Sequence, residues 1–173
     1  MKIHWWPNPV AGDIVWCHFP ENKGIKPGPK PRPALIVKVF DDQTPHLIVL
    51  VAYGTSQKTE QLRSEEFLIA NSEAAAYQLA GLSYSTKFSF HSIVELPYSS
   101  EWFKVPPDAP NGQTPKLGVL HPSLMQLVQA AWEAVKPKTK VSPGFPFHCA
   151  TKPLPGQDRR EEVFRPLRPL PPV

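Results

Sequence analysis

Two dipeptides in the sequence have the residue types that bind phosphate: Arg32-Pro33 and Thr55-Ser56. An arginine presents a planar fork of donors that matches phosphate oxygens, and threonine and serine add small hydroxyl donors. If the chain brings them together, Arg32, Thr55 and Ser56 form a cradle for a phosphate group. The alternatives are a surface ion pair for the arginine and a simple turn for the two hydroxyl residues.

The elements around these dipeptides are expected to place them side by side. Residues Arg32–Phe40 and Leu47–Tyr53 are rich in β-branched side chains and short, so both are predicted strands. A polar, turn-forming stretch separates them. In an antiparallel hairpin the start of the first strand lies beside the end of the second, so the guanidinium and both hydroxyls are expected at one edge of the sheet.

Three further segments have strand patterns. They are Ile14–Phe19, Phe67–Ile69 and Thr86–Leu96. Alternation in the last strand predicts that Phe88, Phe90, Val94 and Leu96 share one face and that Lys87, Ser89, His91 and Glu95 share the other. Trp102 and Phe103 are expected to close the sheet, and Lys104–Lys116 is expected to be a loop.

Two segments have helix patterns. Asn71 or Ser72 is expected to cap a short helix, Ala74–Ala80, and Gly81 to end it. Ser123–Lys136 is the clearest helix, with an apolar stripe at helical spacing: Leu124, Leu127, Val128, Ala131, Trp132 and Val135. The stripe indicates core packing. The fold class predicted is therefore mostly β with a C-terminal helix (α+β).

Charge and proline content divide the chain into a body and a tail. Residues up to Lys136 hold 12 basic and 12 acidic residues, whereas residues 137–173 hold 7 basic and 3 acidic residues and 9 of the 23 prolines. We expect an N-terminal extension at 1–10, a globular domain at 11–136 and a proline-rich basic tail at 137–173. The tail fits a polyproline ligand, an extension that helps hold nucleic acid, or a segment without function.

Several kinds of site and segment are missing from the sequence. It has no Walker loop, dinucleotide-binding glycine pattern, nucleophile elbow or histidine pair at zinc-ligand spacing. Cys17 and Cys149 are too far apart for a metal motif, so no metal and no cofactor are expected. No stretch approaches the roughly 20 apolar residues of a membrane span, and Met1–Pro7 lacks the apolar core of a signal peptide. A soluble cytoplasmic protein is therefore expected.

The loop before Arg32 carries three lysines among prolines: Lys23, Lys26 and Lys30. Prolines restrict the loop to extended conformations, so the lysines could line a groove for a polyanion. The alternative is a solvated loop whose lysines aid solubility.

The order and spacing of three motifs resemble the PemK/MazF family of type II toxin-antitoxin toxins. Gly12–Val15 opens the first strand, Arg32–Val37 opens the second, and Gly54–Ser56 ends the third. The resemblance covers roughly Ala11–Lys136. It implies a small SH3-like barrel, usually a homodimer, that cuts single-stranded RNA without a metal ion and is held inactive by a cognate antitoxin protein.

Carried onto this chain, the resemblance implies a role for each residue of the two dipeptides. Arg32 is the principal catalytic arginine, Thr55 positions the scissile phosphate, and Ser56 lies beside it. Cleavage by the RNA's own 2′-hydroxyl needs a base, an acid and stabilisation of charge on the phosphorane, and an arginine fork serves the last task. The expected RNA-binding cations are Lys23, Lys26, Lys30, Lys58 and Lys87.

The sequence departs from the family at the position of the general base. Some members carry an acidic residue shortly before the arginine, where this chain has Lys26-Pro27-Gly28. By residue type, His18 and His91 are candidates for the base, with a structural role as the alternative for each. Two functions follow: an RNA-cleaving toxin, favoured by the two dipeptides, or a non-catalytic module of the same ancestry that binds RNA or a protein, favoured by the missing base.

Overall fold

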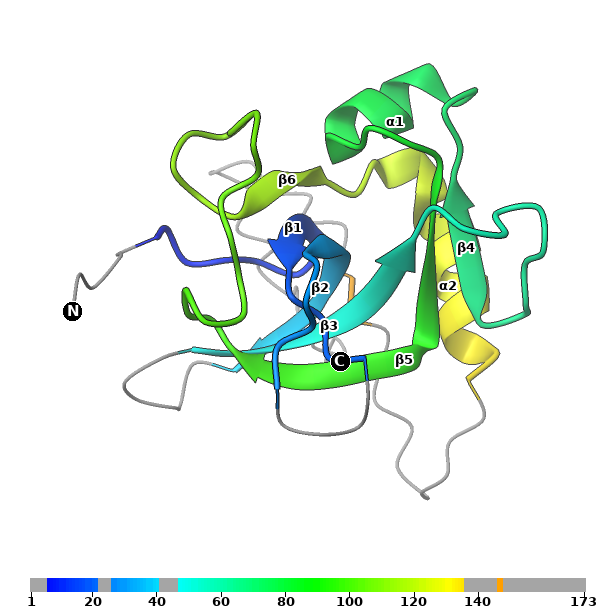
Figure 1. The fold of residues 1–173 in the computed structure, drawn as a ribbon. Coiled ribbons are helices and arrows are strands. Elements are labelled where there is room, and N and C mark those ends of the chain that lie inside the picture. The colour runs from blue at the N-terminus through cyan, green and yellow to red at the C-terminus, as the bar shows by residue number, and fades with distance from the viewer. Residues whose placement is uncertain (1–5, 22–25, 41–46, 136–145, 148–173) are drawn as a thin grey trace, which may run out of the picture.

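One antiparallel β-sheet organises the residues that the computed structural model describes, which are 6–21, 26–40, 47–135 and 146–147. Within them, six strands run in the order β4-β5-β3-β2-β1-β6 (Figure 1). The strands are β1 (Asp13–Cys17), β2 (Arg32–Phe40), β3 (Ile48–Thr55), β4 (Glu66–Ile69), β5 (Thr86–Pro97) and β6 (Lys116–Val119). The helical segments are α1 (Ala74–Ala80), the 3-10 turn η1 (Pro122–Leu124) and α2 (Met125–Glu133). The predicted fold class is confirmed.

Strands β2 and β3 form the hairpin that the sequence predicts. They are antiparallel, and Ala34 lies opposite Tyr53. Continuing that register outward brings the start of β2 beside the end of β3. Arg32 and Thr55 therefore meet where β2 begins and β3 ends, as the two strand patterns predict.

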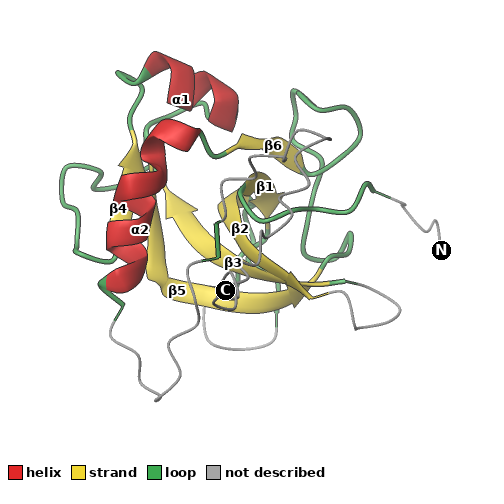
Figure 2. Ribbon diagram, turned by 180° about the vertical axis from the view of Figure 1, so that it is seen from behind, coloured by secondary structure: helices red, strands yellow, loops and turns green. Residues whose placement is uncertain are grey.

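Each face of the curled sheet carries its own core. On one face, side chains such as Leu35 and Phe88 pack with residues of α1 and α2, and α2 crosses β4 and β5 (Figure 2). We call this the helix-side core. On the other face, Ile36 and its neighbours pack against Trp102 and Phe103, which follow β5. We call this the opposite core. Burial of apolar side chains on both faces is the main force that holds the sheet in its curled shape.

Strand β5 bends, and the bend overturns the predicted assignment of its faces. Its pairing with β3 skips residues 90–92, so the alternation of side chains is interrupted there. Phe88 and Phe90 pack in the helix-side core, whereas Val94 and Leu96 pack in the opposite core. The prediction that these four residues share one face is therefore wrong.

The edge of the sheet beside β1 is also different from the prediction. Strand β6 occupies it and begins at Lys116, where the predicted loop Lys104–Lys116 ends. An ion pair of 2.9 Å joins Lys116 Nζ to the buried Asp13 Oδ1 of β1. Phe103 contributes a single bridge to Cys17, the last residue of β1. Trp102 and Phe103 thus pack in the opposite core and do not supply the edge strand.

Helix α1 ends as predicted but starts differently. Gly81 closes it in the left-handed conformation, with φ of 65°. A Cβ at this position would also overlap the carbonyl oxygen of Leu117, so glycine lets α1 lie against β6. Its N-cap is Glu73, whose side chain makes no capping hydrogen bond, so the prediction of Asn71 or Ser72 as the cap is wrong.

Helix α2 is shorter than the predicted Ser123–Lys136. Pro122 begins the 3-10 turn that precedes it, as its fixed φ favours in a first turn. Most of the predicted stripe packs inward, including Val128 and Ala131. Leu127 is the exception, since 51% of it is exposed.

Two aromatic residues from outside the strands and helices complete the cores. The Trp6 ring packs edge-on against Tyr98, with centroids 5.6 Å apart. Phe147 is buried in the helix-side core beside Phe90, although the sequence placed it in the tail. The rest of residues 137–173, apart from 146–147, lie outside the described residues. No helix in the described part of the chain has the length and apolar content needed to cross a bilayer.

Candidate functional site

Gly54 lets β2 and β3 approach closely where the two dipeptides meet. A Cβ at residue 54 would overlap the carbonyl oxygen of Pro33 and lie 2.8 Å from a ring carbon of Phe88. Any side chain there would push apart the strand ends that carry Arg32 and Thr55. The glycine before Thr55 is thus a requirement of the site's geometry.

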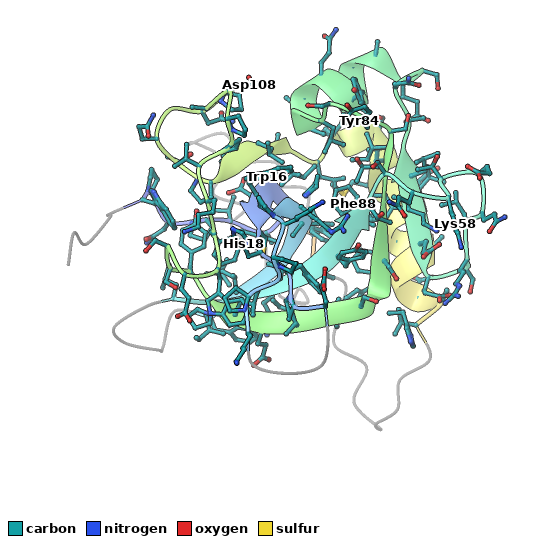
Figure 3. The ribbon with its side chains drawn as sticks, viewed as in Figure 1. Trp16, His18, Lys58, Tyr84, Phe88 and Asp108 are labelled. Atoms are coloured by element: carbon teal, nitrogen blue, oxygen red, sulfur yellow. The ribbon has the colours of Figure 1, made fainter. Side chains whose placement is uncertain are left out.

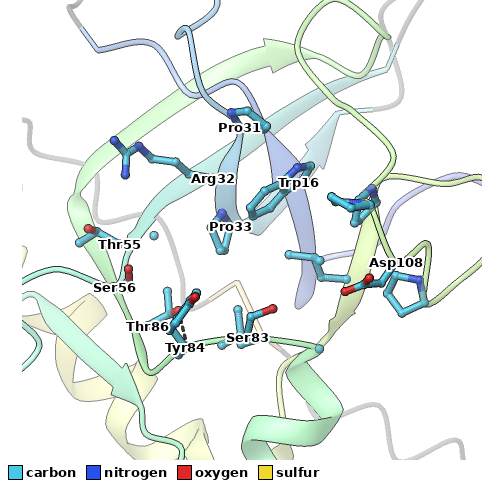
Figure 4. Close-up of a pocket in the computed structure, with 17 residues that line it drawn as sticks. Trp16, Pro31, Arg32, Pro33, Thr55, Ser56, Ser83, Tyr84, Thr86 and Asp108 are labelled. Carbon is cyan, nitrogen blue, oxygen red and sulfur yellow. Dashed lines mark hydrogen bonds between the residues drawn. The ribbon is translucent and has the colours of Figure 1, made fainter.

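Arg32, Thr55 and Ser56 all line one cavity of about 550 Å³, which we call the first hollow (Figure 4). Its other walls come from β1, from the segment that leads into β5 and from the connection that leads into β6. They include Trp16, Pro33, Tyr84, Pro106, Pro107 and Asp108. The volume lies within the roughly 300–1,000 Å³ of small-molecule sites, so the first hollow can hold a ligand of nucleotide size.

Arg32 also lines a second cavity, of about 800 Å³, which we call the second hollow. Tyr53 and His91 are among its other walls. The Arg32 Cζ lies 6.0 Å from the centre of the Tyr53 ring, and this ring packs on Phe19 with centroids 5.1 Å apart. A ring face attracts a guanidinium, so Tyr53 holds Arg32 on the boundary between the hollows.

Thr55 and the predicted RNA-binding Lys87 lie opposite each other on β3 and β5. The Thr55 Oγ1 accepts a hydrogen bond of 3.2 Å from the backbone N–H of Gln57, which leaves its own O–H available to donate. The Lys87 Nζ is 3.1 Å from Glu66 Oε2 and 2.9 Å from the carbonyl oxygen of Gln61. The ammonium is paired with a carboxylate, and only 12% of the Lys87 side chain is exposed. Its charge is therefore less available to a ligand than that of an unpaired surface lysine.

The two histidines predicted as bases have different surroundings. His18 lies 2.6 Å through Nδ1 from the carbonyl oxygen of Gly28, so the ring braces the loop before Arg32, and His18 lines neither hollow. His91 is exposed at the bend of β5 and lines the second hollow together with Arg32. The structure therefore brings His91, and not His18, into a cavity shared with the arginine.

Of the four other predicted RNA-binding lysines, three line neither hollow and one lies outside the described residues. Lys26 and Lys30 are exposed in the loop before Arg32. Lys58 is exposed on the loop after Thr55 and adopts a φ of 50° (Figure 3). Lys23 lies outside the described residues. Their contacts with RNA stay predictions.

Sequence reasoning missed three residues of the first hollow. Trp16 lies opposite Pro33 on β1, Tyr84 precedes β5, and Asp108 projects from the connection between β5 and β6. Figure 4 shows Asp108 at the end of the hollow away from Arg32. The run Pro106-Pro107-Asp108 was the available signal, since two prolines fix the backbone that presents the acid.

The opposite core holds two titratable groups in their neutral forms. Burial raises the pKa of the Cys17 thiol well above its usual range. Burial, and after it the Asp13 carboxylate, raises the pKa of the Tyr98 hydroxyl. Among the described residues, no three His, Cys, Asp or Glu side chains gather as ligands for a metal ion.

The sequence was compared with families of known proteins and with individual proteins. A family model described as PemK-like, MazF-like toxin of type II toxin-antitoxin system matches residues 11–101, which is more than half of the 173 residues. The match includes Arg32, Thr55 and Ser56 but ends before Asp108. No individual curated protein matches the chain. The match over residues 11–101 shows that the chain belongs to the family of PemK-like, MazF-like toxins of type II toxin-antitoxin systems.

Proposed function

We propose that this protein is an endoribonuclease that cuts single-stranded RNA without a metal ion. The observation that carries the proposal is the first hollow, where Arg32, Thr55 and Ser56 line one cavity of nucleotide size. These residues are the ones that the resemblance to the family assigns to the reaction. An arginine fork and two hydroxyls in one cavity suit the binding of a phosphate that acquires charge.

The chemistry uses the RNA's own 2′-hydroxyl as the nucleophile. Its oxygen attacks the adjacent phosphorus, the bond to the 5′-oxygen of the next nucleotide breaks, and a cyclic phosphate remains. The guanidinium of Arg32 donates to the phosphorane oxygens, where negative charge gathers, and the O–H of Thr55 fixes the phosphate. DNA lacks the nucleophile and is therefore not a substrate.

Proton transfer needs a base for the 2′-hydroxyl and an acid for the departing 5′-oxygen. Between the two predicted histidines, we favour His91, because it lines a cavity with Arg32 while His18 is bonded to a backbone carbonyl. An imidazole has one nitrogen that can accept a proton and one that can donate it, so it suits either task. His18 then serves to hold the loop that leads into Arg32.

The test is cleavage of a long single-stranded RNA in excess EDTA by the full chain and three variants. Arg32→Ala is expected to lower the rate by roughly 10²–10³-fold, because the oxyanion loses its donors. Arg32→Lys keeps the charge but loses the fork, so most of the activity is expected to disappear there too. Lys38→Ala is the matched control, since Lys38 is an exposed cation further along the same strand and lines neither hollow.

Three results would count against the proposal in different ways. Equal cutting by wild type and Arg32→Ala would indicate a contaminating nuclease or a different site. Cutting of an RNA whose scissile nucleotide carries 2′-hydrogen would exclude the 2′-hydroxyl as the nucleophile. RNA binding without cutting would favour the non-catalytic module instead.

We also infer the setting in which the enzyme works. Membership in a type II toxin family supports a cognate antitoxin protein as its partner, and the resemblance supports a homodimer acting on RNA in the cytoplasm. Light scattering of the purified full chain checks the dimer. Growth arrest on expression, relieved by Arg32→Ala and by the antitoxin, checks the toxin role. A monomer that cuts RNA at full rate would overturn the dimer.

A further inference from the structure

The end of the first hollow away from Arg32 is lined by one carboxylate, the exposed Asp108 (Figure 4). The segment that carries it is held firmly. The backbone N–H of Ala109 donates to the carbonyl oxygen of Pro106 at 3.0 Å, and Ala109 adopts a φ of 38°, which is uncommon for a residue with a side chain. The Asn111 amide donates to the carbonyl oxygens of Lys116 and Leu117, each at 3.1 Å, and so ties the segment to β6.

The walls between Asp108 and Arg32 are apolar and partly aromatic. Trp16 and Pro33 lie side by side on β1 and β2, and further prolines line the same end as Asp108. Tyr84 stands at the rim with 73% of its surface exposed. Apolar walls with an exposed aromatic ring suit an unstacked nucleobase of single-stranded RNA, because every nucleobase can stack on an aromatic face.

We propose that the first hollow binds a guanine base of the RNA next to the scissile phosphate, and that Asp108 recognises its edge. This inference rests on the proposed function, since the phosphate at Arg32 sets where the neighbouring base lies. Asp108 lies beyond residues 11–101, which the family model matches.

The choice of guanine follows from the chemistry of a carboxylate, which only accepts hydrogen bonds. Guanine presents N1–H and the N2 amino group side by side on one edge, so it donates to both carboxylate oxygens. Adenine and cytosine present one amino group beside a ring nitrogen that accepts, and uracil presents one N–H between two carbonyl oxygens. Each of these bases would place an acceptor against the acid, which is repulsive.

The test compares short RNAs that differ at one nucleotide beside the cut: guanosine, inosine, which lacks the N2 amino group, or adenosine. Wild type is expected to cut the guanosine RNA roughly 10–100-fold more efficiently than the adenosine RNA, with inosine between them. Asp108→Asn, whose amide can pair with other bases, is expected to reduce this preference at least tenfold. Glu101→Gln changes an exposed acid that precedes Asp108 in the chain and lines neither hollow, so it is expected to leave the preference unchanged.

A binding measurement separates failure of this inference from failure of the proposed function. RNAs with 2′-fluoro groups lack the nucleophile, so their affinities report recognition alone. Guanine-selective binding that Asp108→Asn removes, without cutting of normal RNA, would support the base site and overturn the ribonuclease. Cutting with no guanine preference, or with the same preference in Asp108→Asn, would overturn the base site and leave the ribonuclease standing.

Tyr84 gives a second, independent variant. Tyr84→Ala is expected to weaken binding of the 2′-fluoro guanosine RNA roughly tenfold, whereas Tyr84→Phe keeps the stacking surface and is expected to bind normally. Normal binding by Tyr84→Ala would contradict a base stacked at the rim. A loss of antitoxin affinity in Asp108→Asn with unchanged base preference would also overturn the proposal, because the acid would then face the protein partner.

Discussion

The two hollows share Arg32 and differ in almost everything else. The first combines the arginine with two hydroxyls and apolar, aromatic walls, while the second combines it with Tyr53, His91 and the carboxylates of Glu21 and Glu95. The donors and aromatic walls of the first hollow, with the Asp108 carboxylate at its far end, suit the binding of a phosphate and its nucleotide. A histidine beside acids suits the transfer of protons. Arg32, on the boundary, can serve both phosphate binding and proton transfer. These separate roles of the two hollows can be tested.

The largest expected effect belongs to the first hollow. Thr55→Val keeps the shape of the side chain and removes its hydroxyl, so the rate of RNA cleavage should fall by roughly 10²–10³-fold while RNA affinity changes little. Ser56→Ala is the comparison, because Ser56 is exposed and is expected to matter less. Single-turnover cleavage and a binding assay on the full chain give both quantities. An unchanged rate in Thr55→Val would remove this hydroxyl from the reaction.

The role of the second hollow should be visible in the pH dependence of the cleavage rate. If His91 transfers a proton, His91→Gln should lower the cleavage rate on the order of 10²-fold and remove one limb of the pH–rate profile. His18→Gln is the matched variant, and it should lower stability while keeping the shape of the profile, because His18 pairs with the Gly28 carbonyl. A full profile with an unchanged rate in His91→Gln would confine the chemistry to the first hollow.

The half of the site that the sequence predicts is the half that depends on one hairpin. Strands β2 and β3 are neighbours in sequence, have strong β patterns and pair antiparallel, so the start of β2 lies beside the end of β3 even though the register shifts between Ile36 and Lys38. The sequence alone therefore suffices to place Arg32, Thr55 and Ser56 together. The need for glycine at residue 54 also follows from this hairpin, because β2 and β3 approach each other closely there.

The other half depends on contacts between distant segments, which local sequence patterns do not predict. Trp16 faces the first hollow because β1 pairs with β2 across a long loop, and Asp108 reaches it because β6 pairs with β1. β6 has only four residues and no clear pattern, so no local signal predicts it. His91 lies in the second hollow because β5 bends at residues 90–92, and a bend breaks the alternation that sequence reasoning relies on.

Gly54 allows the first hollow to be altered without touching a reactive group. Gly54→Ala should destabilise the protein by about 1–3 kcal/mol, because the new Cβ meets the Pro33 carbonyl and the Phe88 ring. Urea unfolding measures the loss. Cleavage by the folded fraction should fall as well, since the strands that carry Arg32 and Thr55 must separate. Wild-type stability in this variant would show that the two strands can part without cost.

Tyr53 tests how firmly Arg32 is held on the boundary between the hollows. Tyr53→Ala removes the ring under the guanidinium, and the loss of about 1 kcal/mol should lower kcat/KM roughly fivefold. Tyr53→Phe keeps the ring and should behave like wild type. Equal losses in both variants would point to the phenolic hydroxyl instead of the ring.

The smallest effect concerns the opposite core, whose Trp102 and Leu96 also line the second hollow. Burial raises the pKa of Cys17 in the folded state, so the folded protein keeps a proton that the unfolded chain releases above about pH 8.5. The contribution of Cys17 to stability is thus complete below that pH and is lost as the pH rises.

Between pH 7 and pH 9 the free energy of unfolding should fall by about 0.8 kcal/mol more in wild type than in Cys17→Ala. Cys149 is present in both proteins, so its own titration cancels from the difference. Tyr98, whose pKa is also raised by burial, should add a further fall only above about pH 10. Parallel curves for the two proteins would mean that the thiol titrates alike in the folded and unfolded chain.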